Sequence, residues 1–289
     1  MEVITTVEAM RQLVSQAKRQ GKSIGLVPTM GALHDGHLEL LRRAKSMCDV
    51  AITSIFVNPA QFGPNEDFSK YPRDFSNDCT KAANAGIDIV FHPAAAEMYP
   101  EGYVTFVNVD GSITDKLCGL SRPGHFRGVA TIVSKLLNII QPDKAFFGQK
   151  DAQQVVVIKR MVEDLNLNTA IEIVPIVRAI DGLALSSRNA YLSSQEREAA
   201  LVLSRSLRLA EQAVNSGQRD LAQIRQLVVD EINAQKLASI DYVEIYRFPG
   251  LEPIQQLADQ ALLALAVKIG RTRLIDNTIL EAASCCSHR

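Results

Sequence analysis

The sequence predicts an α/β fold in two domains, a Rossmann-like parallel sheet at the N-terminus and a smaller α+β domain at the C-terminus. Up to about residue 185, short apolar runs alternate with amphipathic helical stretches, the pattern of a parallel sheet covered on both faces. Beyond that point, two helical stretches precede three apolar runs joined by short connections, which indicates an α+β unit. We place the domains at residues 1–184 and 185–289.

Helical periodicity and end signals locate the elements of the first domain. A helix is predicted over residues 5–20, with Thr5 and Glu8 as a capping box and Gly21 as the stop. Another is predicted over residues 125–140, where apolar side chains share one face until just before Pro142. The other predicted elements are strands at 23–27, 50–58, 87–93, 144–148 and 171–177 and helices at 37–47, 74–85 and 151–164.

The second domain begins with two predicted helices. The first opens with a capping box of Ser193 and Glu196 and closes at Gly217. The second covers residues 220–236. Strands are predicted at 240–247, 261–269 and 273–277.

Composition narrows the class of protein. The net charge of −1 provides no basic surface for nucleic acid or an anionic membrane, so we expect neither partner. No apolar run approaches the length of about 20 residues that a helix needs to span a bilayer. The N-terminus lacks the features of a signal peptide. An odd number of cysteines without zinc spacing indicates reduced thiols, and together these features predict a soluble, cytoplasmic protein. The cysteines are Cys48, Cys79, Cys118, Cys285 and Cys286.

The segment PTMGALHDGH, residues 28–37, joins a predicted strand to a predicted helix. In a parallel α/β sheet, ligands bind where strands end and helices begin, and a helix N-terminus attracts phosphate. His34 and His37 are three residues apart and project from the same side of the turn, where they can donate to phosphate oxygens. The alternatives are two cap-like polar residues or a metal site, which would lack a third ligand nearby.

Two further clusters follow the same logic. FFGQKDAQQ places Lys150 and Asp151 after a predicted strand, where lysine can neutralise a triphosphate and aspartate can accept from ribose hydroxyls. Helix capping by Asp151 and a solvated Lys150 remain alternatives. LSSRN, residues 185–189, offers two hydroxyls and Arg188 for a polyphosphate, or else forms an N-terminal turn for the next helix. Cys285, Cys286 and His288 fit either a metal site or an unstructured end.

The HxGH segment resembles the signature of the nucleotidyltransferase superfamily that includes class I aminoacyl-tRNA synthetases. The motifs together resemble the pantothenate synthetase (pantoate–β-alanine ligase) family in order and approximate spacing. These motifs are VPTMGALHDGH, SIFVNPAQF, YPRD, SRPGHFRGVATIVSKLLNIIQPD, FFGQKD, VRAIDGLALSSRN and RLIDN, which together run from residue 27 to 277. One departure is Gln149, which stands where the family often has glutamate.

The resemblance implies roles for particular residues. The catalytic set is His37, usually cast as the catalytic acid, with His34, Lys150 and Arg188. Gln61 and Gln154 are the implied pantoate pair, and Gln61, Asn58 and Tyr71 are implied at the β-alanine pocket. The implied ATP contacts are Met30, Gly31, Ala32, Leu33, His34, Asp35, Gly36, His37, Gly148, Gln149, Lys150, Asp151, Val177, Leu185, Ser186, Ser187 and Arg188.

The family chemistry has two halves, in which pantoate and Mg²⁺-ATP form pantoyl adenylate and pyrophosphate, and β-alanine then displaces AMP. The resemblance also implies a homodimer, a C-terminal domain that closes over the ATP site and no protein-bound metal. The loop SRPGHFRG forms part of a cover over the site or else an ordinary helix entry. Two other functions stay open at this point: a synthetase-like enzyme that charges tRNA, and a non-catalytic nucleotide-binding regulator.

Overall fold

The computed structural model describes residues 1–64 and 66–282 and divides the chain into two compact units. The first unit is Met1–Val177, and the second begins at Arg178. The first is an α/β unit and the second an α+β unit, which confirms the predicted fold class. The tail residues Cys285, Cys286 and His288 lie outside the described residues.

The first unit is built on a parallel sheet of six strands in the order β1-β4-β3-β2-β5-β6. The five strands predicted here are present. The edge strand β1 was not predicted, because three residues are too few to show a period. The strands are β1 (Glu2–Ile4), β2 (Ile24–Thr29), β3 (Val50–Ile55), β4 (Ile89–Phe91), β5 (Lys144–Gly148) and β6 (Ala170–Val174).

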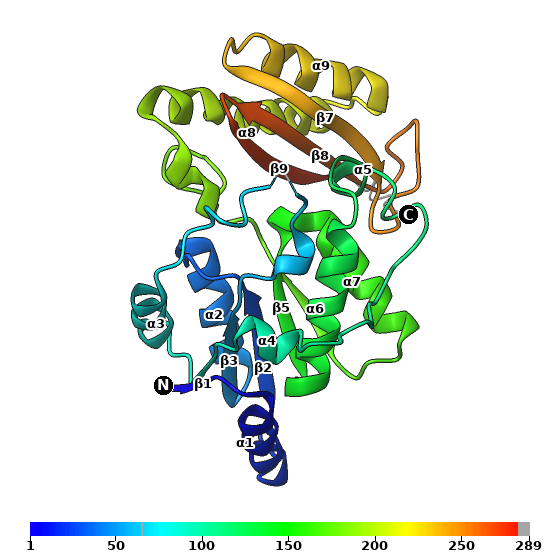
Figure 1. Cartoon of the computed structure of the whole chain (residues 1–289). Helices are drawn as coiled ribbons and strands as arrows, with labels where there is room; N and C mark the ends of the chain where they lie inside the picture. The colour runs from blue at the N-terminus through cyan, green and yellow to red at the C-terminus, as the bar shows by residue number, and fades with distance from the viewer. Residues whose placement is uncertain (65, 283–289) are drawn as a thin grey trace. The chain divides into compact units, whose positions relative to one another are not determined.

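Helices cover both faces of this sheet (Figure 1). One face buries Leu26 of β2 against α1, α6 and α7, and the other buries Val27 against α2 and α3, as the alternation of side chains along a strand requires. The helices are α1 (Val7–Arg19), α2 (Asp35–Met47), α3 (Phe75–Asn84), α4 (Ala95–Met98), α5 (Leu117–Ser121), α6 (His125–Ile140) and α7 (Ala152–Asp164), with 3₁₀ turns η1 (Pro59–Gln61) and η2 (Gln149–Asp151).

The predicted cap of α1 is wrong by one residue. Thr6, not Thr5, is the N-cap, and its side chain accepts from the backbone N–H of Ala9 at 3.3 Å. Because the helix begins at Val7, Glu8 is its second residue and cannot complete a capping box, which needs the third.

Helix α6 lies directly against η1 because residue 128 is glycine. A Cβ added at Gly128 would collide with the Ala60 carbonyl and would lie 2.6 Å from the Cα of Gln61. The Asn58 side chain also donates to the Gly128 carbonyl at 3.1 Å. The backbones of the helix and the turn are therefore in direct contact.

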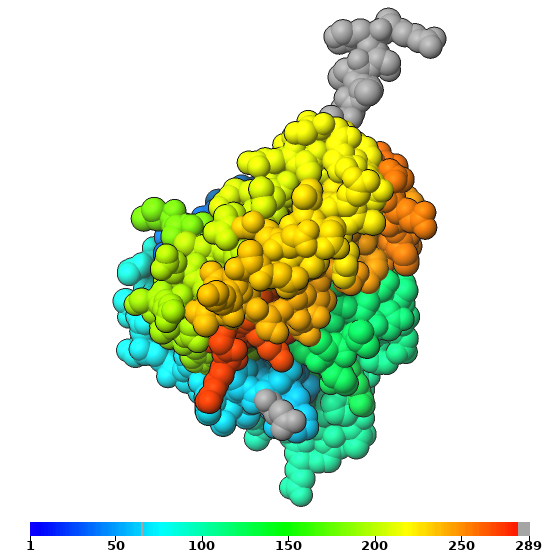
Figure 2. Space-filling view, turned by 90° about the horizontal axis from the view of Figure 1, so that it is seen from above, coloured from blue at the N-terminus to red at the C-terminus, as the bar shows by residue number. Residues whose placement is uncertain are grey.

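The second unit contains a three-stranded antiparallel sheet whose buried face packs against two helices. The predicted capping box is present: the Ser193 N–H donates to Glu196 at 2.9 Å, and the Glu196 N–H donates to Ser193 at 3.2 Å. The outer face of the second helix is exposed and forms part of the yellow surface in Figure 2. The elements are η3 (Ser187–Tyr191), α8 (Ser194–Asn215), α9 (Leu221–Asn233), β7 (Ala238–Arg247), β8 (Gln260–Ile269) and β9 (Thr272–Glu281).

A buried ion pair ties the start of the second unit to its sheet. Arg178 donates to both carboxylate oxygens of Asp276 on β9, at 2.6 and 3.0 Å. The Asp276 side chain is 1% exposed and the Arg178 side chain 29%, so the carboxylate is shielded from solvent and the guanidinium only in part. Within residues 1–64 and 66–282, no helix has the length and apolar character required to cross a membrane.

Candidate active site

The strand order brings two predicted motifs together. The chain runs outward from β2 through β3 to β4 and then returns to form β5 on the other side of β2. Parallel pairing of Gly25 with Lys144 and of Leu26 with Ala145 fixes their register. The carboxyl ends of β2 and β5 are therefore neighbours at the point where the strand order reverses. Open α/β sheets bind ligands at this point.

After β2 the chain makes a tight turn with unusual backbone conformations. Gly31 has φ +81° and Ala32 has φ +50°, in the left-handed region that favours glycine. His34 is then extended and occupies the N-cap position of α2, which begins at Asp35. The helix thus starts two residues before the predicted position, and His37 lies in its first turn.

A carboxylate on α3 holds this turn in place. The N–H groups of Ala32 and Leu33 donate to the two oxygens of Asp78, at 2.8 and 2.7 Å. Lys81, one turn later on the same helix, donates to the Leu33 carbonyl at 2.6 Å. Asp78 is 2% exposed, and a Cβ at Gly31 would lie 2.8 Å from one of its oxygens. Glycine at residue 31 is required by this close approach as well as by its φ.

The predicted site does not include Asp78 or Lys81. One signal was available in the sequence, because Asp78 lies on the same face of α3 as the buried alanines Ala82 and Ala85. A carboxylate on a buried helix face needs hydrogen-bond partners. The partners of Asp78 are about 45 residues away in sequence, so the sequence pattern alone does not identify them. These bonds also mean that the N–H groups of Ala32 and Leu33 already donate to an anion within the chain.

The rings of His34 and His37 are in contact at the entrance to α2, with centroids 4.0 Å apart and planes tilted by 35°. The His34 N–H donates to Nδ1 of His37 over a long 3.4 Å, which leaves the proton of the neutral His37 ring on Nε2. Nδ1 of His34 is buried and accepts no hydrogen bond from the described residues. The pair therefore has unused hydrogen-bonding capacity at a helix N-terminus.

Both imidazoles are neutral near pH 7. Burial, and next the charge of the nearby Lys150, lower the pKa of His34 to about 4. Burial also lowers the pKa of His37 well below its ordinary value, with contributions from His34, Lys150 and Lys81. Lys150 is thus within electrostatic reach of both histidines, so the structure brings the second motif to the first.

Lys150 and Asp151 lie in η2, directly after β5. The Lys150 Nζ is 3.6 Å from the Asp151 carboxylate, whose side chain is 47% exposed. Asp151 occupies the N-cap position of α7, but its side chain makes no capping hydrogen bond. The capping alternative therefore does not explain this aspartate, whereas a contact with a ligand hydroxyl remains compatible with its exposure.

The amide of Gln61 lies next to the histidine turn. Its Nε2 donates to the Met30 sulfur at 3.2 Å, and its Oε1 accepts from Asn58 at 3.0 Å. Asn58 also donates to the Gly128 carbonyl and accepts from the Tyr99 hydroxyl at 2.7 Å. Asn58 is 1% exposed and fully bonded, so it orients Gln61 and has no amide hydrogen left for a ligand.

Two adjacent glutamines on α7 have different environments. Gln153 is buried and donates to the carbonyls of Ile113 and Lys116 at 2.9 and 2.8 Å. It also accepts from the Cys118 N–H at 2.9 Å. The Gln154 side chain is half-buried and bonds to none of the residues that the structure describes. Gln153 thus holds the 113–118 loop, and Gln154 is the one with a free amide.

The remaining predicted residues are divided between the units. Tyr71 is buried and meets Phe62 edge-on at 6.0 Å. Val177 is the last residue of the first unit, whereas Leu185, Ser186, Ser187 and Arg188 belong to the second. There the Ser186 hydroxyl accepts from the Arg188 N–H at 3.3 Å and caps η3, a turn separate from α8.

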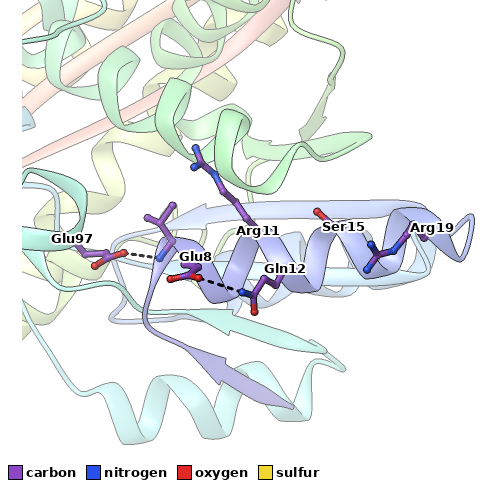
Figure 3. A pocket seen from close by; sticks show the side chains of 7 residues that line it. Glu8, Arg11, Gln12, Ser15, Arg19 and Glu97 are labelled. Carbon is purple, nitrogen blue, oxygen red and sulfur yellow. Dashed lines mark hydrogen bonds between the residues drawn. The ribbon is translucent and has the colours of Figure 1, made fainter.

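A surface groove along α1 contains none of these residues (Figure 3). Its carboxylates serve the helix itself: Glu97 accepts from the Val7 N–H at 2.7 Å, and Glu8 accepts from Gln12 at 3.4 Å. The lining residues are Val7, Glu8, Arg11, Gln12, Ser15, Arg19 and Glu97.

Comparisons with known proteins agree over nearly the whole chain. Residues 2–279 match the family model described as pantoate-beta-alanine ligase. The chain is 60% identical over 97% of its length to a pantothenate synthetase of Pelotomaculum thermopropionicum, of which the match covers 99%. It is 55% identical, also over 97% of its length, to that of Heliobacterium modesticaldum, of which the match covers 100%.

Solved structures show the same fold. The crystal structure of pantothenate synthetase from Thermus thermophilus has a TM-score of 0.92 and 41% identity, covering 96% of this chain and 99% of that one. A pantoate-beta-alanine ligase from Francisella tularensis, complexed with β-γ ATP and β-alanine, has a TM-score of 0.79 and 36% identity. That match covers 96% of this chain and 97% of the other.

The first prediction concerns the charge of His34. Since its pKa is lowered to about 4, the ring should stay neutral at about pH 5.5, where an ordinary histidine of pKa about 6.5 is mostly protonated. Replacing Lys150→Gln should raise the pKa, but not restore it fully, because burial remains. The ¹⁵N chemical shifts of the His34 ring nitrogens, followed against pH, measure the pKa in the wild type and in the variant. Lys45→Gln, which removes a lysine paired with Asp88, should change nothing. A His34 ring that titrates near 6.5 would refute the described environment.

The second prediction concerns Asp78. Asp78→Asn places an amide donor against one of two N–H donors, and we expect a loss of about 1–3 kcal/mol in the free energy of unfolding. Exchange of the Ala32 and Leu33 amide hydrogens should accelerate. Asp74→Asn on the same helix is the control, because asparagine caps as well as aspartate. Unchanged stability together with unchanged protection of these two amides would contradict the assigned role.

Proposed function

The chain belongs to the pantoate-beta-alanine ligase family, and we propose that it makes pantothenate in two steps through a pantoyl-adenylate intermediate. The observation that best supports this route is the meeting of His34, His37 and Lys150 at the reversal point of the strand order. Such a position is suited to the phosphates of a nucleotide. ATP is the nucleotide substrate, and pantoate and β-alanine are the two parts that are joined.

In the first step, a carboxylate oxygen of pantoate attacks the α-phosphorus of ATP in line. The bond from that phosphorus to the oxygen bridging to the β-phosphate breaks, and pyrophosphate leaves with the electron pair. The chain's contribution is positioning and charge stabilisation. We assign donation from the neutral imidazoles of His34 and His37 to phosphate oxygens, with the Lys150 ammonium as a fixed positive charge. Arg188 completes the proposed set, and ATP contacts extend over residues 30–37, 148–151, 177 and 185–188.

In the second step, the amine of β-alanine attacks the acyl carbon of the adenylate. The bond from that carbon to the phosphate oxygen breaks, AMP leaves, and the new nitrogen loses a proton to become an amide. Water can also hydrolyse the mixed anhydride, so a site that excludes water favours amide formation over hydrolysis.

We assign the pantoate contacts to Gln61 and Gln154. Gln61 directs its amide donors toward Met30, and Gln154 has a free amide, so each can bind a carboxylate or hydroxyl oxygen. The β-alanine pocket would use Gln61, with Asn58 and Tyr71 beside it. In this assignment Asn58 acts by orienting Gln61, since its own amide is fully bonded.

The proposed Mg²⁺ would be carried by ATP. Among residues 1–64 and 66–282 there is no cluster of three or more His, Cys, Asp or Glu side chains that could hold a metal ion. Mg²⁺ keeps several waters and binds readily to phosphate oxygens, so it needs no protein cage. It would neutralise charge on the triphosphate, in addition to Lys150.

We also propose a homodimer located in the cytoplasm. In the first unit, the irregular segment 104–109 exposes Val104 by 83% and Phe106 by 41%, and two copies of such a surface could cover one another. Cys48, Cys79 and Cys118, the cysteines within residues 1–64 and 66–282, form no disulfide, as expected in a reducing compartment. Sedimentation equilibrium tests the homodimer: a particle with the mass of one chain at micromolar concentration would exclude it.

The third prediction tests the intermediate. With pantoate and Mg²⁺ but without β-alanine, the protein should exchange labelled pyrophosphate into ATP. ¹⁸O from the pantoate carboxylate should appear in AMP after full turnover, because one carboxylate oxygen leaves with phosphorus. His37→Ala should slow turnover by about 100- to 1000-fold. Lys150→Ala should depress the exchange, whereas Lys45→Ala, on the outside of α2, should not. Label found in inorganic phosphate, with ADP as product, would exclude adenylation.

The fourth prediction separates the adjacent glutamines. Gln154→Ala should raise the KM for pantoate about 5- to 100-fold with little change in the KM for ATP. The variant leaves a buried polar group of pantoate without a hydrogen-bond partner, which costs about 1–3 kcal/mol of binding free energy. Gln153→Ala should instead lower the unfolding midpoint, since the variant loses three hydrogen bonds to the backbone of the 113–118 loop. Steady-state kinetics and thermal unfolding of both variants provide the comparison. The assignment is wrong if Gln154→Ala affects both substrates equally.

A further inference from the structure

A network of charged and polar side chains surrounds the backbone of Gln61 in the first unit. Arg122, at the end of α5, donates to both oxygens of Glu66 at 2.8 and 2.6 Å. A third guanidinium nitrogen of Arg122 lies 2.9 Å from Nε2 of His125, the first residue of α6. Nδ1 of His125 lies 2.9 Å from the carbonyl oxygen of Gln61. None of these three side chains has a role in the reaction described above.

The partners determine the proton position on His125. A guanidinium can only donate, so Nε2 of His125 must accept and its proton must be on Nδ1. That N–H then donates to the Gln61 carbonyl. Burial, and next the charge of Arg122, lower the pKa of His125 to about 4, which agrees with a neutral ring. His125 is 8% exposed, so the arrangement is shielded from competing water.

Glu66 completes the charge balance. Burial alone would raise the pKa of this carboxyl, but the hydrogen bond and charge of Arg122 outweigh burial and lower it. Glu66 lies in the loop between η1 and α3, so the ion pair fastens this loop to the entrance of α6. Arg122 reaches the Gln61 carbonyl as well, at 3.4 Å.

We propose that Arg122 and His125 are positioning residues for pantoate, which fix the peptide of Gln61 so that its amide faces the substrate. The proposal rests on the pantoate-binding role proposed for Gln61. The residue is held twice, at its carbonyl by His125 and at its side-chain oxygen by Asn58. Between these two anchors only the Nε2 donors remain for a ligand, and they point toward Met30 of the histidine turn.

The kinetic test is a comparison of substrates in the full-length protein. His125→Leu should raise the KM for pantoate about tenfold or more while the KM for ATP changes far less, since a small displacement of a contact group is costly. His125→Asn, whose amide can occupy the Nδ1 position and donate to the Gln61 carbonyl, should recover most of the loss. Arg122→Met should resemble His125→Leu. Arg160→Met, an exposed arginine on α7, is the control.

A structural measurement needs no activity. Two-bond ¹H–¹⁵N spectra of the wild type should show His125 as the Nδ1–H tautomer, and Arg122→Met should abolish the preference. An Nε2–H tautomer in the wild type would overturn the proposal, even if His125→Leu fails to fold.

The kinetic outcomes separate this proposal from the proposed function. If the wild type makes no AMP from ATP, pantoate and β-alanine, the proposed function is wrong. The tautomer measurement on His125 is then the only test of the hydrogen bonds among Arg122, His125 and Gln61. If the wild type is active and His125→Leu and Arg122→Met leave the KM for pantoate unchanged, or raise both KM values alike, the positioning role is excluded.

Discussion

The parallel pairing of β2 with both β3 and β5 is the constraint on which the first unit depends. It places the strand that carries the histidine turn in the middle of the sheet, with the end of β5 beside it. The two segments of the proposed nucleotide site in this unit then follow from short connections: the turn and α2 after one strand, η2 and α7 after the other. A change in this register would separate Lys150 from the histidines whatever the local sequence.

Electrostatics at the site is dominated by burial and not by charge pairing. Two histidine rings in contact next to a lysine would repel each other if protonated, and desolvation keeps them neutral. The same holds for His125 beside Arg122. Each neutral ring offers one donor and one acceptor, whereas a doubly protonated ring could only donate. The chain thereby places positive charge at Lys150 and leaves the imidazoles as directional hydrogen-bonding groups.

The sequence was sufficient for the fold class, for most elements and for the family, because strand–helix alternation is local and motifs such as FFGQKD keep their order. It did not reveal Asp78, whose partners at Ala32 and Leu33 are distant in sequence. Nor could the sequence distinguish Gln153 from Gln154, because the difference arises only when the 113–118 loop folds and forms hydrogen bonds with the Gln153 amide. The cap at Thr6 was missed because the extended residue before a helix is defined by backbone geometry.

The bare backbone contact at Gly128 has a mechanical consequence. With no side chain between α6 and η1, nothing soft is present to absorb a movement of the helix. Other residues of α6, such as Leu136 and Ile140, pack in the apolar core of the first unit. A substitution there that shifts the helix by a fraction of an ångström would shift Gln61 with it. The pantoate contact proposed at Gln61 is in this sense a rigid extension of the core, so we expect a change in core volume to change substrate affinity as well.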